Sequence, residues 1–183
     1  SLRANEVDVR KLCRAVLASL EDGRGPRTPV VVLAGAQGGE AKSFVLKGLA
    51  SIFRPADVFH SPQPSSFPLM GLPTARVAIL DDFRFDQSVL AFATMCLWFD
   101  GSPLPISRPQ NQAGVTGHMV YGGTGPIVLS TKLQDMQRMA AAAAATPFGL
   151  QPADAEASML LRRLVVFVFR VRVTPPEKHL LTC

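Results

Sequence analysis

The chain has 183 residues, of which 48% are hydrophobic, and it carries a formal net charge of +5. This length and composition suit a single compact domain with a sizeable core, and they exclude a disordered chain. No apolar run approaches the roughly 20 residues of a membrane-spanning helix, the N-terminus lacks the pattern of a signal peptide, and the three widely separated cysteines indicate reduced thiols in an intracellular protein.

The first predicted element is an amphipathic helix near the N-terminus. Asn5 is the expected N-cap, Asp8 lies in the first turn, and Gly23 ends the helix. Apolar residues follow one another at helical spacing in between, namely Val9, Leu12, Cys13, Val16 and Leu20. We therefore expect residues 1–26 to form a packing helix and linker, residues 27–174 the main domain, and residues 175–183 a tail.

A buried strand followed by a loop of small residues is the most informative stretch. Residues 30–34 are apolar and rich in valine, which is typical of a strand buried on both faces. The loop and the start of the next helix consist of Ala36, Gln37, Gly38, Gly39, Glu40, Ala41, Lys42 and Ser43. In a phosphate-binding loop the backbone N–H groups hold the phosphates, Lys42 would reach the β- and γ-phosphates, and Ser43 would bind Mg²⁺. The pattern therefore predicts a site for ATP and Mg²⁺, and an ordinary strand-turn-helix connection is the alternative.

A second charge-free strand is predicted at residues 77–80, after an irregular segment rich in proline and serine. Asp81 and Asp82 follow this strand directly. Ligands bind at the carboxyl ends of the strands in open α/β sheets. There Asp81 would hold Mg²⁺ through water, and its neighbour would orient the attacking water. The alternative is a strand end that carries two solvated acids.

The middle of the chain predicts a helix, a pair of short strands and a third buried strand. Residues 85–99 have the pattern of a mostly apolar helix, with Val89, Leu90, Ala93, Cys96 and Leu97 on its core side. Residues 102–106 would start a hairpin, and two short strands around a loop tip fit the glycine-rich residues 114–125. Residues 126–131 form an apolar strand that ends in hydroxyl side chains and is followed by Lys132. A polar side chain at this strand end would lie near a γ-phosphate or an attacking water.

The last part of the chain predicts a helix end and an edge strand. Six consecutive alanines at residues 140–145 favour a helix, and a low-complexity surface segment is the alternative. Residues 160–173 indicate a final strand in which Arg170 and Arg172 alternate with valines, as on an edge strand. Four buried strands that alternate with helices predict an α/β fold with a parallel sheet flanked by helices. One edge of that sheet would then bring together Lys42, Asp81, Asp82 and Lys132.

Four segments, taken in this order, resemble superfamily 3 helicases, the ATPase domains of small DNA virus replication proteins, and are most similar to the papillomavirus replicative helicase. Residues 65–83, SSFPLMGLPTARVAILDDF, resemble the approach to the Walker B motif of that family. Residues 99–108, FDGSPLPISR, resemble the segment that leads into a DNA-contacting hairpin. PIVLST at residues 126–131 resembles the sensor strand, and LRRLVVFVF at residues 161–169 resembles the strand that begins with the arginine finger.

The resemblance implies a P-loop NTPase fold of the AAA+ type, and a hexameric ring that moves along single-stranded DNA as ATP is hydrolysed. The catalytic residues that it implies are Asp81, Asp82, Lys132 and Arg163, with Arg163 as the finger that reaches into a neighbouring subunit's site. Nucleic-acid contacts are implied for Arg108, Gln110 and Asn111, and His118 is either a substitute contact or an exposed loop histidine. The net charge permits such a partner, although the basic residues are scattered. A viral protein of this kind would be located in the host nucleus, and no membrane partner is expected.

Four features depart from the pattern of that family. Ala41 replaces a glycine and Lys132 replaces the sensor asparagine, the hairpin tip at residues 109–111 lacks basic side chains, and a glycine-rich insert covers residues 112–125. A methyl group at Ala41 would crowd the phosphates, and a neutral tip would weaken contacts to a nucleic-acid backbone. Two hypotheses stay open: an active ATP-dependent helicase domain, and a degenerate relative that serves as an oligomeric nucleic-acid-binding scaffold. A small-molecule kinase fits the loop and the sheet but accounts neither for residues 65–83 nor for Arg163.

Overall fold

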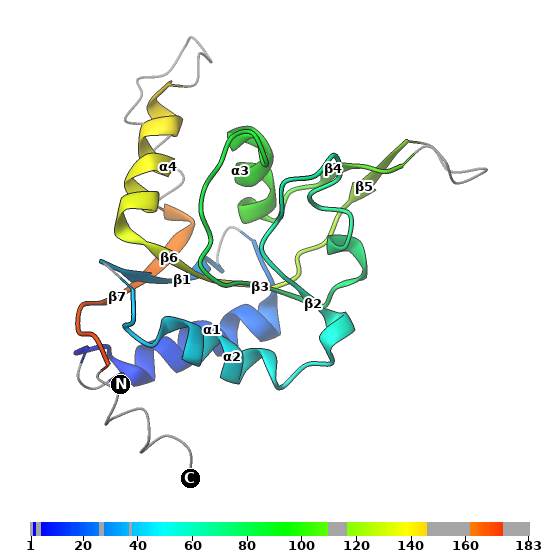
Figure 1. Ribbon diagram of the computed structural model, residues 1–183. Coiled ribbons are helices and arrows are strands. Elements are labelled where there is room, and N and C mark those ends of the chain that lie inside the picture. The colour runs from blue at the N-terminus through cyan, green and yellow to red at the C-terminus, as the bar shows by residue number, and fades with distance from the viewer. Residues whose placement is uncertain are drawn as a thin grey trace.

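A five-stranded parallel sheet lies at the centre of the computed structural model (Figure 1). The structure describes residue 2 and residues 5–25, 28–36, 38–109, 117–145 and 162–173. The strands of the sheet are β1 (Val30–Gly35), β2 (Val58–Phe59), β3 (Val77–Leu80), β6 (Ile127–Lys132) and β7 (Leu164–Phe169). Their order is β2-β3-β6-β1-β7, and every neighbouring pair is parallel. The predicted parallel α/β sheet is confirmed.

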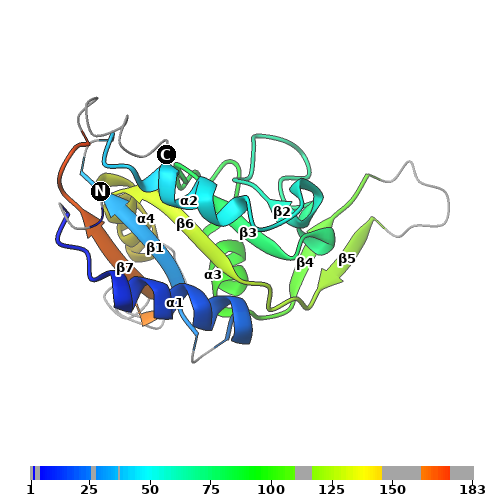
Figure 2. The same ribbon diagram turned by 90° about the horizontal axis from the view of Figure 1, so that it is seen from below.

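Helices cover both faces of this sheet (Figures 1 and 2). One face carries α1 (Val9–Asp22) and α2 (Lys42–Ala50), and the other carries α3 (Phe92–Asp100) and α4 (Leu133–Ala145). The alanines at the end of α4 are helical, as their high helix propensity predicts. No helix in the described parts of the chain has the length and apolar character needed to cross a membrane.

Alternate residues of the strands enter two separate apolar cores. In β1, Val30 and Val32 belong to the core that also contains Trp98 of α3, whereas Val31 and Leu33 belong to the core beneath α1 and α2. Both faces of the strand are therefore buried, and only an uninterrupted apolar run can fill such a strand. This is why charge-free runs locate β1 and β3 correctly.

Asp8, and not Asn5, caps the first helix. The Asp8 carboxylate accepts a hydrogen bond from the backbone N–H of Lys11 at 3.1 Å, and the helix begins at Val9. The Asn5 side chain is buried and binds the backbone of Arg170 and Val171 near the end of the chain. The predicted cap was wrong because both residue types cap helices, and the tertiary contact of Asn5 has no local signal.

The third helix is shorter than predicted and is turned about its axis. It begins at Phe92, because Asp86 accepts hydrogen bonds from Ser88 and holds residues 86–90 in a turn. Its buried residues are Phe92, Met95, Trp98 and Phe99, whereas Leu97 is 40% exposed. Of the residues predicted for the core side, Leu90 is buried and Cys96 packs against the core, whereas Ala93 is exposed like Leu97. The prediction was therefore only partly right, because a helix in which nearly every residue is apolar gives no phase information.

Strand β2 was not predicted at all. It has two residues, Val58–Phe59, and follows a short 3₁₀ helix at Pro55–Asp57. A two-residue strand offers no periodicity, so the irregular composition around it hides the strand. In the sheet it nevertheless forms an edge beside β3.

An antiparallel hairpin projects from the body of the protein, as Figures 1 and 2 show. It consists of β4 (Leu104–Ser107) and β5 (His118–Tyr121), in which Leu104 pairs with Tyr121. Arg24, which is 3% exposed, holds the base of the hairpin by donating hydrogen bonds to the carbonyls of Gly123 and Gly125. Burial lowers the pKa of the Arg24 guanidinium to about 10, against the opposing effect of the nearby Tyr121 hydroxyl.

Strand β7 lies at the other edge of the sheet, as the sequence predicts, but it ends at Phe169. Arg170 and Arg172 come after its end, so their alternation with valines does not belong to the strand. The segment that contains them runs back across the loop that follows β1, where it becomes part of the site described next.

Candidate functional site

The carboxyl ends of β1, β6 and β3 form one edge of the sheet. In the parallel register Gly35 pairs with Lys132, and Leu80 pairs with Leu129. Three groups therefore lie at the same edge of the sheet. They are the loop that follows β1, the acids Asp81 and Asp82 that follow β3, and Lys132 at the end of β6. Open α/β sheets bind their ligands at this edge.

Ser43 and Asp81 come into direct contact here. Ser43 Oγ donates a hydrogen bond to Asp81 Oδ1 at 2.8 Å, and Ser130 Oγ of β6 donates to the same oxygen at 2.7 Å. The Ser130 oxygen in turn accepts a hydrogen bond from the backbone N–H of Asp82 at 2.8 Å. Mg²⁺ binds one or two protein oxygens together with water and phosphate oxygens. The hydroxyl of Ser43 and the carboxylate of Asp81 fit that ion.

Asp82 has a different environment from its neighbour. Its backbone is left-handed, with φ 48°, and its carboxylate accepts a hydrogen bond from Arg84 at 2.8 Å. This bond raises the pKa of the Arg84 guanidinium above its ordinary value. The Asp82 side chain is about half exposed, at 54%. The structure therefore brings Asp81 to Ser43 and leaves Asp82 at the surface, next to an arginine.

Three of the described residues in the loop between β1 and α2 have positive φ. Gly38 and Gly39 have φ values of 121° and 80°, and Ala41, just before α2, has φ 64° and ψ 18°. A left-handed conformation costs a residue with a Cβ about 1–2 kcal/mol. Ala41 therefore adopts a conformation that favours glycine, and its methyl group adds local strain without removing the turn. Whether the methyl group crowds a bound phosphate stays a prediction.

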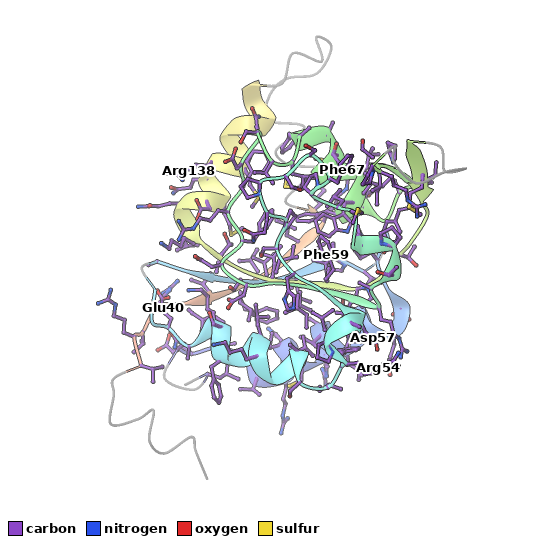
Figure 3. The ribbon with its side chains drawn as sticks, turned by 45° about the vertical axis from the view of Figure 1, so that its right-hand side comes forward. Glu40, Arg54, Asp57, Phe59, Phe67 and Arg138 are labelled. Atoms are coloured by element: carbon purple, nitrogen blue, oxygen red, sulfur yellow. The ribbon has the colours of Figure 1, made fainter. Side chains whose placement is uncertain are left out.

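A buried ion pair fills the inside of this loop, where Figure 3 shows Glu40 at the junction between the sheet and α2. Glu40 Oε2 lies 2.6 Å from Lys42 Nζ and accepts a hydrogen bond from the backbone N–H of Gly38 at 2.9 Å. Glu40 is 1% exposed and Lys42 is 9% exposed. A Cβ on Gly35 would lie 2.2 Å from Lys42 Nζ, so a side chain at this position would displace the ion pair. The lysine that was predicted to bind phosphate faces an internal carboxylate instead.

The chain that follows β7 fixes the outside of the loop. The backbone N–H of Val173 donates to Gly39 O at 3.0 Å, and Arg172 Nε donates to Gly38 O at 3.2 Å. Asn5 anchors the same segment by accepting hydrogen bonds from the backbone N–H groups of Arg170 and Val171. Two distant parts of the sequence thus hold the loop in its shape.

The remaining residues predicted for this edge make fewer contacts. Ala36 is exposed, and Gln37 lies outside the described residues. Lys132 is half-buried beside Gly35 in the register, and among the described residues its ammonium forms no ion pair within 4.0 Å. A role for Lys132 at a phosphate stays a prediction.

Arg163 lies at the amino ends of the strands, opposite the carboxyl ends that form the candidate site. It immediately precedes β7, and its carbonyl accepts a hydrogen bond from Val30 N at the start of β1. Its guanidinium forms an ion pair with Asp100 at the end of α3, with 2.8 Å between Nε and Oδ1. The structure therefore separates Arg163 from the residues at the carboxyl edge of its own chain.

The residues predicted to contact nucleic acid belong to the projecting hairpin. Arg108 follows β4, and its backbone N–H donates to Gly117 O at 2.9 Å. His118 begins β5, and only its backbone is described. Gln110 and Asn111 lie outside the described residues. A hairpin that starts near residues 102–106 is confirmed, but the described part of residues 114–125 contributes only one of its strands, β5, and not the two predicted there. The contacts stay predictions.

The sequence analysis missed two residues with clear roles in this geometry, Ser130 and Asp100, and it placed Glu40 in the phosphate-binding loop without predicting its ion pair with Lys42. Ser130 had a partial signal, since hydroxyls at the end of a buried strand were expected to face a ligand. The ion pairs of Glu40 and Asp100 had no signal, because a single acid in a loop or at a helix end is normally solvated.

No protein-family model matches the chain, and no curated protein matches its sequence. Among solved structures, the A-form apo structure of the NrS-1 C-terminal region matches 92% of this chain and 36% of its own length, with 16% identity and a TM-score of 0.55. The chain thus spans about a third of that structure. DnaI matches with 13% identity and a TM-score of 0.48, covering 92% of this chain and 83% of its own. Hsp104 with ATPγS and FITC-casein matches with 12% identity and a TM-score of 0.47, covering 87% of this chain and 30% of its own.

The sheet order, the loop from β1 into α2 and the acid after β3 together define the class. A buried strand that runs through a glycine-containing loop into a helix beginning with Lys-Ser is the P-loop arrangement. The chain has the fold of a P-loop NTPase, with a five-stranded parallel sheet flanked by helices. The predicted fold class is confirmed.

Proposed function

We propose that this chain binds MgATP at the edge formed by β1, β3 and β6, and hydrolyses it as a subunit of an oligomeric, ring-forming helicase of the superfamily 3 type acting on single-stranded DNA. The observation that carries the proposal is the hydrogen bond between Ser43 Oγ and Asp81 Oδ1. This bond joins the start of α2 to the end of β3, the two places from which P-loop NTPases supply their Mg²⁺ ligands.

Isothermal titration of MgATP into the chain, beside Ser43→Ala, tests the proposal. We expect the wild-type chain to bind MgATP, and Ser43→Ala to bind it about 10- to 100-fold more weakly, because an oxygen contact to a charged group is worth about 1.5–3 kcal/mol. Titrations with excess EDTA should give the same affinity for both proteins.

Ser51→Ala supplies the matched control, since Ser51 ends the same helix and its hydroxyl only caps Gly48 O. The site would be refuted if the wild-type chain failed to bind MgATP, or if its affinity did not depend on Mg²⁺.

A degenerate scaffold is the second candidate function, and the Glu40–Lys42 ion pair favours it. A P-loop lysine that is neutralised within its own loop is poorly placed to attract a phosphate. A scaffold would assemble and bind nucleic acid without nucleotide turnover. An ATPase assay in the presence of single-stranded DNA distinguishes the two candidates, because only the helicase hydrolyses ATP.

The projecting hairpin supports the nucleic-acid part of the proposal. Arg108 follows the outer end of β4, on the side of the hairpin away from its base at Leu104, and we expect Arg108→Ala to weaken binding of single-stranded DNA several-fold. The magnitude of the slope of log affinity against log salt should fall by roughly one unit, because binding releases about one counterion fewer when one phosphate contact is lost.

Fluorescence anisotropy at several salt concentrations measures both quantities. Arg10→Ala is the control, since Arg10 is exposed on α1 and its loss removes the same charge. An unchanged slope for Arg108→Ala would exclude this contact.

A further inference from the structure

The buried carboxylate of Glu40 occupies the place at which a P-loop receives an anion. It is held by Lys42 Nζ at 2.6 Å and by the backbone N–H of Gly38 at 2.9 Å. A lysine ammonium and loop N–H groups are the donors that a P-loop offers to a phosphate. The protein therefore supplies its own anion to these donors.

We propose that Glu40 is an internal competitor of the nucleotide: its carboxylate blocks the phosphate position, and a polyphosphate binds only when this side chain leaves the loop. The inference rests on the proposed function and adds a residue that controls affinity at the same site. A phosphate oxygen and the Glu40 carboxylate need the same donors. Two negative charges that share these donors would also repel each other, so the two groups exclude one another.

The contacts around the loop indicate that the Glu40 carboxylate leaves by rotation of its side chain and not by movement of the loop backbone. The carbonyls of Gly38 and Gly39 are held from outside by Arg172 and Val173. The helix that begins at Lys42 is packed on the sheet through Leu46, which is 1% exposed. Rotation of the Glu40 side chain disturbs neither restraint, whereas movement of the loop backbone breaks the hydrogen bonds to residues 172 and 173.

The exclusion has a measurable consequence for affinity. When only a fraction of the molecules is competent to bind, the apparent dissociation constant rises by the inverse of that fraction. A side chain that gives up the lysine and the Gly38 N–H more readily than glutamate should therefore tighten nucleotide binding, even though it adds no contact to the nucleotide.

The test is a set of calorimetric titrations with MgATP and, separately, with inorganic pyrophosphate. The proteins are the wild-type chain, Glu40→Gln, Glu40→Ala and Glu21→Gln. Glu21 is exposed near the end of α1, so Glu21→Gln removes the same charge away from the loop. We expect both Glu40 variants to bind MgATP and pyrophosphate about tenfold or more tightly than the wild-type chain, with Glu21→Gln unchanged. Glu40→Ala is included because the glutamine of Glu40→Gln could still occupy the phosphate position, whereas alanine leaves it open.

The outcomes separate this inference from the function on which it rests. Equal MgATP affinity for the wild-type chain and both Glu40 variants would overturn the competition and leave the nucleotide site standing. A tightening shared by Glu21→Gln would also overturn it, because the effect would then come from net charge. If none of the four proteins bound MgATP or pyrophosphate, both the competition and the proposed function would be refuted.

Discussion

Replacing Arg163 by alanine is expected to lower ATP turnover by about 10³-fold or more while the affinity for MgATP is unchanged. An arginine that stabilises the charge developing on a transferred phosphoryl group acts on the transition state, so its loss reduces turnover and spares ground-state binding. Steady-state ATPase assays with single-stranded DNA present, beside calorimetric titration of MgATP, measure the two quantities.

If Arg163 acts as an arginine finger, its position predicts that it serves the site of a neighbouring subunit. Arg163 lies at the start of β7, beside Val30, and Gly35 at the base of the P-loop is five residues further along β1. At about 3.3 Å per residue, roughly 16 Å of strand separates the two positions, more than an arginine side chain spans. A finger at this position would therefore have to serve a site on another copy of the chain.

Two controls distinguish a finger from a structural residue. Arg162→Ala removes an identical charge from the adjacent, exposed position and should retain turnover. Asp100→Asn breaks the ion pair that holds Arg163 while keeping the guanidinium, so it should also retain turnover if the role is catalytic. An equal loss in Asp100→Asn and Arg163→Ala would assign the effect to the ion pair. Mixing Arg163→Ala with Asp81→Asn chains should restore part of the activity, and an absence of rescue would count against action between subunits.

The sheet could be predicted from the sequence wherever a strand is long and buried on both faces. The runs at β1 and β3 carry no charge, β6 begins with an apolar run and β7 has an apolar interior, so each can be recognised in the single sequence. Strand β2 could not be predicted, since two residues set no pattern and its place depends on pairing with β3. Helix α3 begins later than predicted because Asp86 accepts hydrogen bonds from Ser88 and forms a turn. Such turns also occur in loops that precede no helix, so the sequence does not show where this helix begins.

The candidate site was predictable to the extent that it depends on strand ends. Ser43 and Asp81 each follow a recognisable strand, and parallel strands bring their carboxyl ends together. The pairing of Glu40 with Lys42 could not be predicted, because it requires Gly38 and Gly39 to take positive φ and fold the acid inward. The pairing of Asp100 with Arg163 joins residues 63 positions apart, on α3 and before β7, for which no local pattern exists.

Lys42→Ala is expected to abolish nucleotide binding and also to destabilise the fold by about 3–5 kcal/mol, because it leaves the buried Glu40 carboxylate without its cation. Both partners are largely enclosed, with side-chain exposures of 10% for Lys42 and 1% for Glu40, so water cannot replace the missing ammonium. Urea unfolding followed by circular dichroism measures the loss. Lys47→Ala, at an exposed position near the end of the same helix, should change stability little.

The double variant Glu40→Gln with Lys42→Ala separates the two effects of removing the lysine. Without the buried carboxylate the fold should regain a large part of the lost stability, whereas nucleotide binding should stay absent, since Lys42 is the cation that would meet the phosphates. Loss of binding in Lys42→Ala alone proves little, because an altered loop would give the same result. If the double variant stayed as unstable as Lys42→Ala, the cost would lie in lost packing of the lysine stem, and the carboxylate would not be the strained group. If the double variant bound MgATP as well as Glu40→Gln does, Lys42 would not be a phosphate ligand.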